Sequence, residues 1–138
     1  MGRILAIDYG LKRTGIAVTD PLRIIATGLL TIETSNLLHF IKEYCSKEKV
    51  DIFVLGYPLN LDGSPTHGTE PVQRFRKKLE NEFPVIPVYY EDERYTSKLA
   101  VEAMVQGGVR KKHRSDKSLI DKVSATIILQ AYLERTSS

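Results

Sequence analysis

Acidic residues stand at three places in the chain where the surrounding sequence is apolar. Asp8 ends the first apolar run, Asp92 and Glu93 end another, and Asp121 lies near the start of an apolar helical stretch. A buried carboxylate is costly unless it gains hydrogen bonds, an opposite charge or a metal ion. Strand ends and a helix start can meet on one side of a sheet, so we expect these acids to converge.

Each acid also has a structural explanation that the sequence leaves open. Asp8 could close a turn with Gly10, and the 91–94 run could form an internal ion-pair network. Asp121 stands three residues after Ser118, which resembles a capping box. Taken alone, Asp121 is better explained as such a cap, whereas the three positions taken together favour convergence.

Convergent carboxylates suit Mg²⁺ or Mn²⁺, hard cations that prefer oxygen ligands. Two such ions ~4 Å apart can activate water and stabilise the leaving oxygen of a phosphodiester. The three histidines are scattered and Cys45 falls on the apolar face of a predicted helix, so no zinc spacing exists. No Ser/His/Asp arrangement or Walker-type phosphate loop stands out. Metal-assisted phosphodiester hydrolysis is the favoured chemistry.

The basic residues fit a polyanionic partner. The net charge is +3, and the excess lies in the second half of the chain. Lys12 and Arg13 follow Asp8 closely and could contact a phosphate near a metal. A basic segment just before Asp121 could hold a nucleic-acid backbone, although its charge taken alone is better explained by a solvated loop. Its basic residues are Arg110, Lys111, Lys112, Arg114 and Lys117.

The spacing of apolar residues predicts an α/β fold. Alternating and short apolar runs indicate strands, and a period near 3.6 indicates helices, one of them capped by Ser35 or Asn36. We predict one domain over residues 1–138: a mixed five-stranded sheet, a three-strand meander followed by alternating helices and strands, with helices on both faces. The predicted strands are 3–8, 15–19, 24–32, 51–56 and 84–90, and the predicted helices are 37–45, 71–83, 96–105 and 119–134.

Length and composition describe a globular chain. The 138 residues suit one domain, and 42% hydrophobic with 27% charged residues excludes a disordered protein. A single cysteine cannot form an intramolecular disulfide. No apolar run approaches the ~18 residues that span a bilayer. We therefore expect a cytoplasmic protein with no membrane partner.

Four segments, in order, resemble the YqgF/RuvX family, whose fold is ribonuclease H-like. They are DYGLKRTGIAVTD at 8–20, GYPLNLDG at 56–63, DERYTS at 92–97, and DKVSA at 121–125 leading into ILQAYL at 128–133. The resemblance runs from about residue 3 to residue 134. Departures are small, with Tyr95 where the family often has Leu or Phe and Ser124 where Ala is common.

The resemblance implies a bacterial cytoplasmic nuclease that matures the 5′ end of precursor 16S ribosomal RNA. It also implies an alternative, a Holliday junction resolvase similar to RuvC. The expected partner is structured RNA, within a pre-ribosomal particle or alone, with branched DNA as the alternative. Asp8, Glu93 and Asp121 become the candidate catalytic residues and ligands of Mg²⁺ or Mn²⁺. Whether Asp92 or Glu93 faces the metal stays open, because neighbouring strand residues point to opposite faces.

Two other classes of protein are alternatives to a nuclease. An actin-like or sugar-kinase-like ATPase shares an Asp-x-Gly motif like Asp8-Tyr9-Gly10, but such proteins close two domains around ATP. A non-catalytic nucleic-acid-binding assembly factor would have little need for three costly acids. The sequence shows no self-complementary apolar patch and leaves the oligomeric state open.

Overall fold

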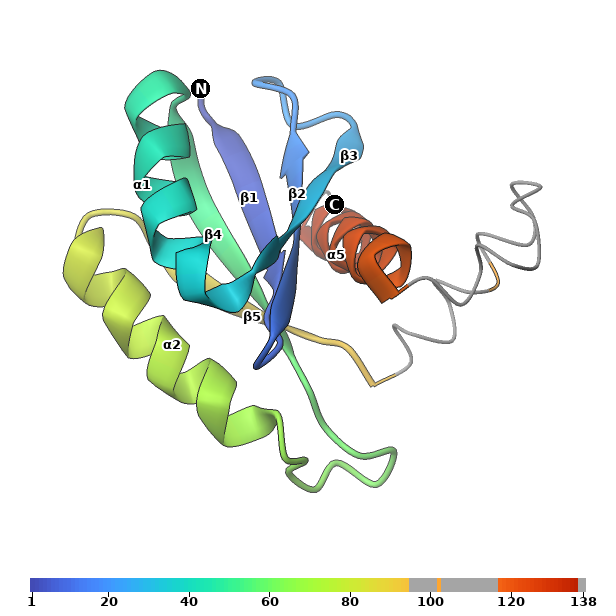
Figure 1. Cartoon of the computed structure of the whole chain (residues 1–138). Helices are drawn as coiled ribbons and strands as arrows, with labels where there is room; N and C mark the ends of the chain where they lie inside the picture. Colours follow the sequence, from blue (N-terminus) through green and yellow to red (C-terminus); the bar gives the residue numbers. More distant parts are fainter. Residues whose placement is uncertain (95–101, 103–116, 137–138) are drawn as a thin grey trace.

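A mixed five-stranded sheet with helices on both faces forms the described part of the chain (Figure 1). The computed structural model describes residues 1–94, 102 and 117–136. The strands are β1 (Arg3–Asp8), β2 (Arg13–Thr19), β3 (Ala26–Glu33), β4 (Val50–Tyr57) and β5 (Val88–Asp92). The helices are α1 (Leu37–Lys47), α2 (Thr69–Glu82) and α5 (Lys117–Thr136), with a 3₁₀ turn, η1, at Thr34–Asn36.

The strand order is β3-β2-β1-β4-β5. β1, β2 and β3 form the predicted antiparallel meander, while β4 pairs in parallel with both β1 and β5. β1, β4 and β5 therefore end on the same side, which we call the carboxyl end of the sheet. The opposite side, where β1 and β4 begin and β2 ends, is the amino end.

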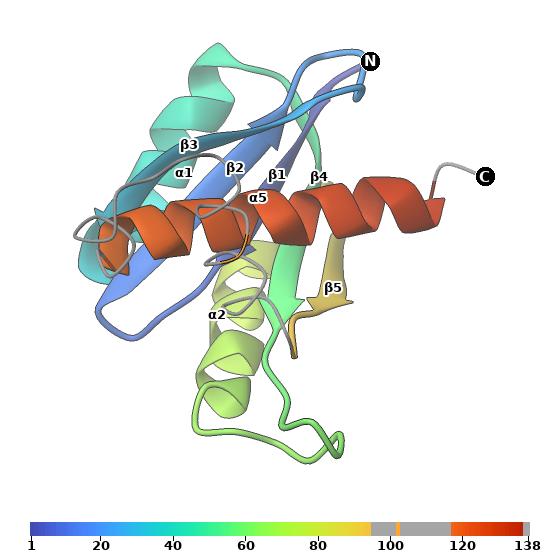
Figure 2. The ribbon, with the colours of Figure 1, turned by 90° about the vertical axis from the view of Figure 1, so that its right-hand side faces the viewer.

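The two faces of the sheet carry separate cores. Leu5 and Ile7 pack on one face with residues of α1 and α2, whereas Ile4 and Ala6 pack on the other face with α5. α5 crosses the face of the sheet opposite α1 and α2 (Figure 2). Side chains of a strand alternate between faces, so this division fixes which positions of β1 and β4 face α5.

The structure corrects three details of the predicted elements. β5 begins at Val88, because the segment with Pro84 and Pro87, which lack an amide hydrogen, forms a turn instead. α1 has no side-chain cap, since residues 34–36 form η1 instead. α5 begins at Lys117, so Asp121 lies beyond its first turn. The predicted helix 96–105 lies outside the described residues, apart from the helical Glu102.

Cys45 of α1 is half-buried against the core, and burial raises the pKa of its thiol. That environment fits a packing residue better than a reactive nucleophile. Among the described helices, none combines the length and apolar character needed to cross a bilayer.

Candidate active site

Asp8 and Gly56 mark the centre of the candidate site at the carboxyl end of the sheet. Ile7 of β1 is in register with Leu55 of β4, so the next residues, Asp8 and Gly56, are level and both face α5. A Cβ on Gly56 would lie 2.5 Å from Glu93 Oε2 and 2.6 Å from Ile128 Cδ1. The absent side chain thus leaves the space that the Glu93 carboxylate fills.

Alternation along β5 decides which acid of the 92–93 pair turns toward Asp8. Tyr89 contacts Tyr132, and Glu91 pairs with Arg135 at 2.7 Å, so both face α5. Glu93, two residues further, lies on the same face, and its amide donates to the Tyr57 carbonyl at 3.3 Å. Asp92 instead pairs with Arg94 at 2.7 Å. The geometry favours Glu93 as the second carboxylate of the site.

The Asp8 and Glu93 side chains are half-buried and hydrogen-bonded to each other. Burial raises the pKa of Asp8 from 3.8 to about 6, against the lowering effect of the Glu93 hydrogen bond. Burial, together with the charge of Asp8, raises the pKa of Glu93 from 4.5 to about 10. Neither carboxylate has a Lys or Arg partner among residues 1–94 and 117–136. The raised pKa values favour a proton on the pair in the metal-free protein, and a divalent cation that bound there would displace this proton into solvent.

Asp121 approaches this pair from α5, and its charge contributes to the raised pKa of Asp8. Its position depends on Gly15 of β2, where any Cβ would overlap the Asp121 carbonyl oxygen. The Asp121 carboxylate accepts a hydrogen bond from Arg13 Nε at 3.2 Å. In the described ranges, no three or more Asp, Glu, His or Cys side chains are close enough together to bind a metal ion. The site is therefore a carboxylate pair with a third acid beside it.

A pocket of about 630 Å³ adjoins the Arg13–Asp121 contact. It lies between the β1–β2 turn, the end of β3 and the start of α5, and Lys12 and Arg13 line it. The Thr31 hydroxyl donates to the Ser118 carbonyl at 2.5 Å and joins β3 to α5 there. Of the predicted backbone-binding residues, Lys117 begins α5, whereas Arg110, Lys111, Lys112 and Arg114 lie outside the described residues.

Sequence reasoning missed the two glycines that shape the site, Gly15 and Gly56. Each lies inside a strand, and a glycine there often marks a close approach of another segment. Gly15 admits α5, and Gly56 admits Glu93. The predicted strands 15–19 and 51–56 placed these glycines at strand ends, so the signal appears only because β2 and β4 extend beyond them.

Comparison with known proteins identifies the family. The model of the RuvX family, described as Holliday junction resolvase, matches residues 2–135. The chain belongs to the RuvX family. This confirms the resemblance drawn from the four sequence segments.

Curated RuvX relatives align over nearly their whole length. A Porphyromonas gingivalis protein is 51% identical over 134 residues, covering 97% of each chain. A Christiangramia forsetii protein is 49% identical over 133 residues, covering 96% of this chain and 98% of the relative. Both carry the name "Putative pre-16S rRNA nuclease".

Solved structures of RuvC share the fold. Thermus thermophilus RuvC in complex with a Holliday junction substrate superposes with a TM-score of 0.56 at 16% identity, covering 99% of this chain and 98% of RuvC. A second structure of that RuvC also has a TM-score of 0.56, at 14% identity. The likeness confirms the predicted ribonuclease H-like fold.

Proposed function

We propose that this protein is a metal-dependent nuclease of the cytoplasm that hydrolyses phosphodiesters of precursor 16S ribosomal RNA near its 5′ end. The observation that carries the proposal is the half-buried, hydrogen-bonded Asp8–Glu93 pair, which has no Lys or Arg partner among the described residues. Such a pair is costly in a folded protein unless a cation compensates it. The names of the RuvX relatives support RNA as the substrate.

The residues at the site fit a hard divalent cation such as Mg²⁺ or Mn²⁺. All the candidate ligands are carboxylate oxygens, which these ions prefer. Gly56 has no side chain, so the space beside it is available to the Glu93 carboxylate. We assign Asp8 and Glu93 as ligands, with Asp121 joining when Arg13 releases it. When bound, a divalent cation supplies Lewis-acid polarisation of the phosphodiester.

The basic residues bind and orient the substrate in this proposal. Arg13 neutralises Asp121 before substrate and metal arrive, and afterwards turns its guanidinium to a phosphate, which it binds well because of its planar donors. Lys12 lines the same pocket and adds a second positive charge. Arg110, Lys111, Lys112, Arg114 and Lys117 are proposed, from the sequence, to bind the nucleic-acid backbone as well.

Branched DNA is the second candidate substrate. The family description as Holliday junction resolvase favours it. The same carboxylates would serve either polymer, because both are cut at a phosphodiester. A resolvase must cut two strands symmetrically, whereas RNA maturation requires a cut at one end.

The test is cleavage by the purified protein in Mg²⁺ or Mn²⁺, with 5′-extended ribosomal RNA and a four-way DNA junction side by side. Asp8→Asn removes a proposed ligand, and Asp51→Asn is a matched control at the amino end of the sheet. A lost contribution of ~4 kcal/mol to transition-state stabilisation, as expected of a Lewis acid, corresponds to about a thousandfold loss of rate in Asp8→Asn. Asp51→Asn should retain activity.

The outcomes separate the candidates. Metal-dependent RNA cutting that Asp8→Asn abolishes supports the proposal. Symmetric cutting of the junction alone would assign the protein to recombination. Binding without cutting of either substrate would contradict the nuclease proposal and favour a non-catalytic assembly factor.

A further inference from the structure

A second polar pocket opens at the carboxyl end of β4, on the side of the sheet that α2 covers. Its volume is about 560 Å³, and it lies between the loop of residues 58–68 and the first turns of α2. Gln73, Arg74 and Lys77 of α2 line it, together with Tyr57, the last residue of β4. We call it the α2 pocket. The proposed cleavage chemistry uses none of these residues.

The wall of the α2 pocket is built before any ligand arrives. In the 58–68 loop, the Asn60 side-chain amide donates to Ser64 Oγ at 3.0 Å and to the Pro65 carbonyl at 3.1 Å. The buried Thr69 hydroxyl donates to the Pro58 carbonyl at 2.5 Å and accepts from the Thr66 amide at 2.9 Å. These contacts fix the loop against the start of α2, so a ligand meets a formed surface.

The pocket adjoins the catalytic carboxylates. Tyr57 follows Gly56, beside which Glu93 lies, and the Tyr57 carbonyl accepts the Glu93 amide at 3.3 Å. The Cα atoms of Gly56 and Tyr57, like any consecutive pair, are ~3.8 Å apart. This spacing is close to the ~3.4 Å rise per nucleotide of a stacked strand. Gly56 and Tyr57 face opposite sides of the sheet, so a strand leaving the carboxylates crosses the end of β4 and reaches the pocket within a few nucleotides.

Charge and hydrogen-bonding groups define the chemistry of the ligand. Lys77 is exposed and forms no ion pair with any residue in the described ranges. Arg74 pairs with Glu70 at 2.7 Å, but both side chains are more than half exposed, so the pair is weak and a phosphate can replace Glu70. Arg74 and Lys77 are three residues apart and share one face of α2. The Gln73 amide donates to the Tyr57 hydroxyl at 2.9 Å, which fixes the Tyr57 side chain in the lining of the pocket.

We infer that the α2 pocket binds a backbone phosphate of the RNA strand that is cut at Asp8 and Glu93, through Lys77 and Arg74. This rests on the proposed function for the identity of the polymer. It adds a binding surface on α2 to the one formed by Lys12 and Arg13. The substrate strand is then held on both sides of the cleavage position, and one contact alone does not set its register.

Binding of single-stranded RNA from the 5′ extension, measured by fluorescence anisotropy in EDTA with Asp8→Asn protein, tests the pocket without cleavage. Lys77→Ala and Lys78→Ala are the matched pair. Both lysines are exposed on α2, but Lys78 does not line the pocket. Loss of one phosphate contact lowers the salt slope by about 0.7 for a single strand, which amounts to about fivefold weaker binding at 0.1 M salt. We expect that loss for Lys77→Ala and less than a twofold change for Lys78→Ala.

A second measurement locates the contact on the RNA. Oligonucleotides carry one uncharged methylphosphonate at successive positions. At one position, a few nucleotides from the cleavage site, the substitution should weaken binding about fivefold with Lys77 present and have no effect with Lys77→Ala. Equal losses for Lys77→Ala and Lys78→Ala, or no position coupled to Lys77, would overturn the inference. RNA cleavage by the wild-type protein is scored separately, so a coupled phosphate without cleavage would reject the nuclease proposal and keep the pocket.

Discussion

Carboxylates at the two ends of the sheet are held in opposite ways. At the amino end, Asp51 accepts a hydrogen bond from the Gly2 amide at 2.7 Å and pairs with Arg23 at 3.0 Å, so its pKa is lowered. At the carboxyl end, Asp8 and Glu93 face each other, and burial raises the pKa of both. The same residue type is thus satisfied by the protein at one end and left to an external cation at the other.

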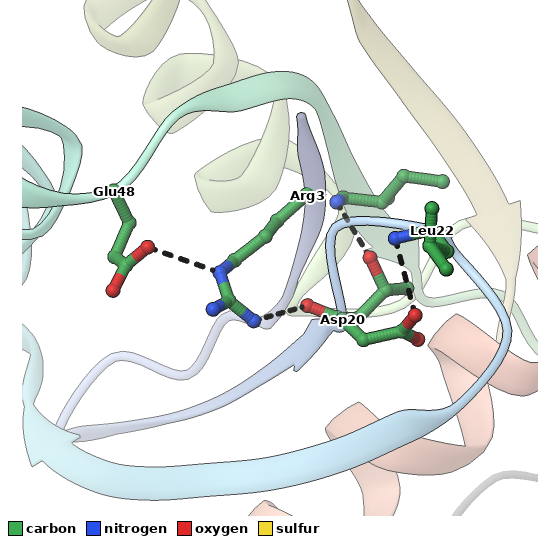
Figure 3. A network of polar contacts seen from close by, with 6 residues as sticks. Arg3, Asp20, Leu22 and Glu48 are labelled. Carbon is green, nitrogen blue, oxygen red and sulfur yellow. Dashed lines mark hydrogen bonds and ion pairs between the residues drawn. The ribbon is translucent and has the colours of Figure 1, made fainter. Parts of the chain in front are cut away.

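The network at the amino end is closed (Figure 3). Arg3 lies between Glu48, at 3.3 Å, and the Thr19 carbonyl, at 2.9 Å. Asp20 accepts hydrogen bonds from the backbone amides of Leu22, Ile24 and Ile25, which lower its pKa. These acids fix the β2–β3 loop and the start of β1. Arg3, Asp20, Arg23, Glu48 and Asp51 each have a hydrogen-bond or ion-pair partner among the described residues, so the network stabilises the fold.

The difference teaches how to tell a functional acid from a structural one. Both ends combine carboxylates with basic residues nearby, so composition alone does not separate them. What separates Asp51 from Asp8 and Glu93 is the first neighbour of the carboxylate, which is an amide or guanidinium for Asp51 and a second carboxylate for Asp8 and Glu93. Strongly perturbed acids that face each other are typical of catalytic and metal sites.

The largest effect that separates the two ends of the sheet is expected from alanine substitutions at two glycines. A Cβ on Gly56 would lie 2.5 Å from Glu93 Oε2, and a Cβ on Gly2 would lie 2.6 Å from Asp51 Oδ1. Both alanine variants push a carboxylate aside by a similar amount. A displacement of ~1 Å at a catalytic site can cost about a hundredfold in rate, so we expect that loss for Gly56→Ala in the cleavage assay. Gly2→Ala should keep its activity and lose thermal stability.

Circular dichroism melting curves of both alanine variants supply the control. If Gly56→Ala folds like the wild type and still cuts RNA at the wild-type rate, the position of Glu93 does not matter for the reaction. If Gly2→Ala lost activity while retaining its melting temperature, the amino end would have a catalytic role and the contrast would fail.

The pH dependence of stability should also differ between the ends, with an effect of a few kcal/mol. In metal-free protein, folded Asp8 and Glu93 bind protons more tightly than the unfolded chain, so the free energy of unfolding falls as pH rises from about 4 toward about 10. The shift of about two pKa units in Asp8 corresponds to ~3 kcal/mol. Asp20 and Asp51 act in the opposite direction, and their contribution is lost only as pH falls below about 3.8.

Urea unfolding in EDTA at pH 6 and pH 9 checks this prediction. The wild type should be less stable at pH 9, Asp8→Asn should lose less over the same range, and Mn²⁺ should restore the wild type but not the variant. Asp51→Asn should be destabilised at both pH values. Equal pH dependence in the wild type and Asp8→Asn would show that the carboxylate pair is not strained in the folded protein.

The sequence predicted the elements of the fold better than the contacts of the site. β1 was predicted to the residue because an apolar run is bounded by Arg3 and an acid. Alternation could not choose between Asp92 and Glu93, since the predicted strand ended at residue 90, whereas β5 continues to Asp92. Choosing required the contacts of Tyr89 and Glu91 with α5, which only the packed helix provides.

The Arg13–Asp121 pair was beyond sequence reasoning for a similar reason. The two residues are 108 positions apart, and they meet because Gly15 lets α5 approach β2. No local pattern encodes a contact of that separation. The sequence assigned Arg13 to a phosphate and Asp121 to a metal, and the structure shows these two expected ligand-binding groups bound to each other.

In the Arg13–Asp121 pair, as in Asp92–Arg94, an acid at the carboxyl end is bound by a guanidinium, and the Arg13–Asp121 pair leads to the smallest predicted effect. Arg13 and a divalent cation compete for Asp121, so Arg13→Ala should bind Mn²⁺ a few-fold more tightly, an amount typical of a half-exposed ion pair worth ~0.5–1 kcal/mol. The same variant should bind RNA more weakly, because Arg13 is then missing from the phosphate. Titration calorimetry with Mn²⁺ and RNA binding in EDTA measure the two effects separately. Weaker binding of both ligands would mean that Arg13 holds Asp121 in place for the metal, and the acid would then be structurally satisfied in the same way as Asp51.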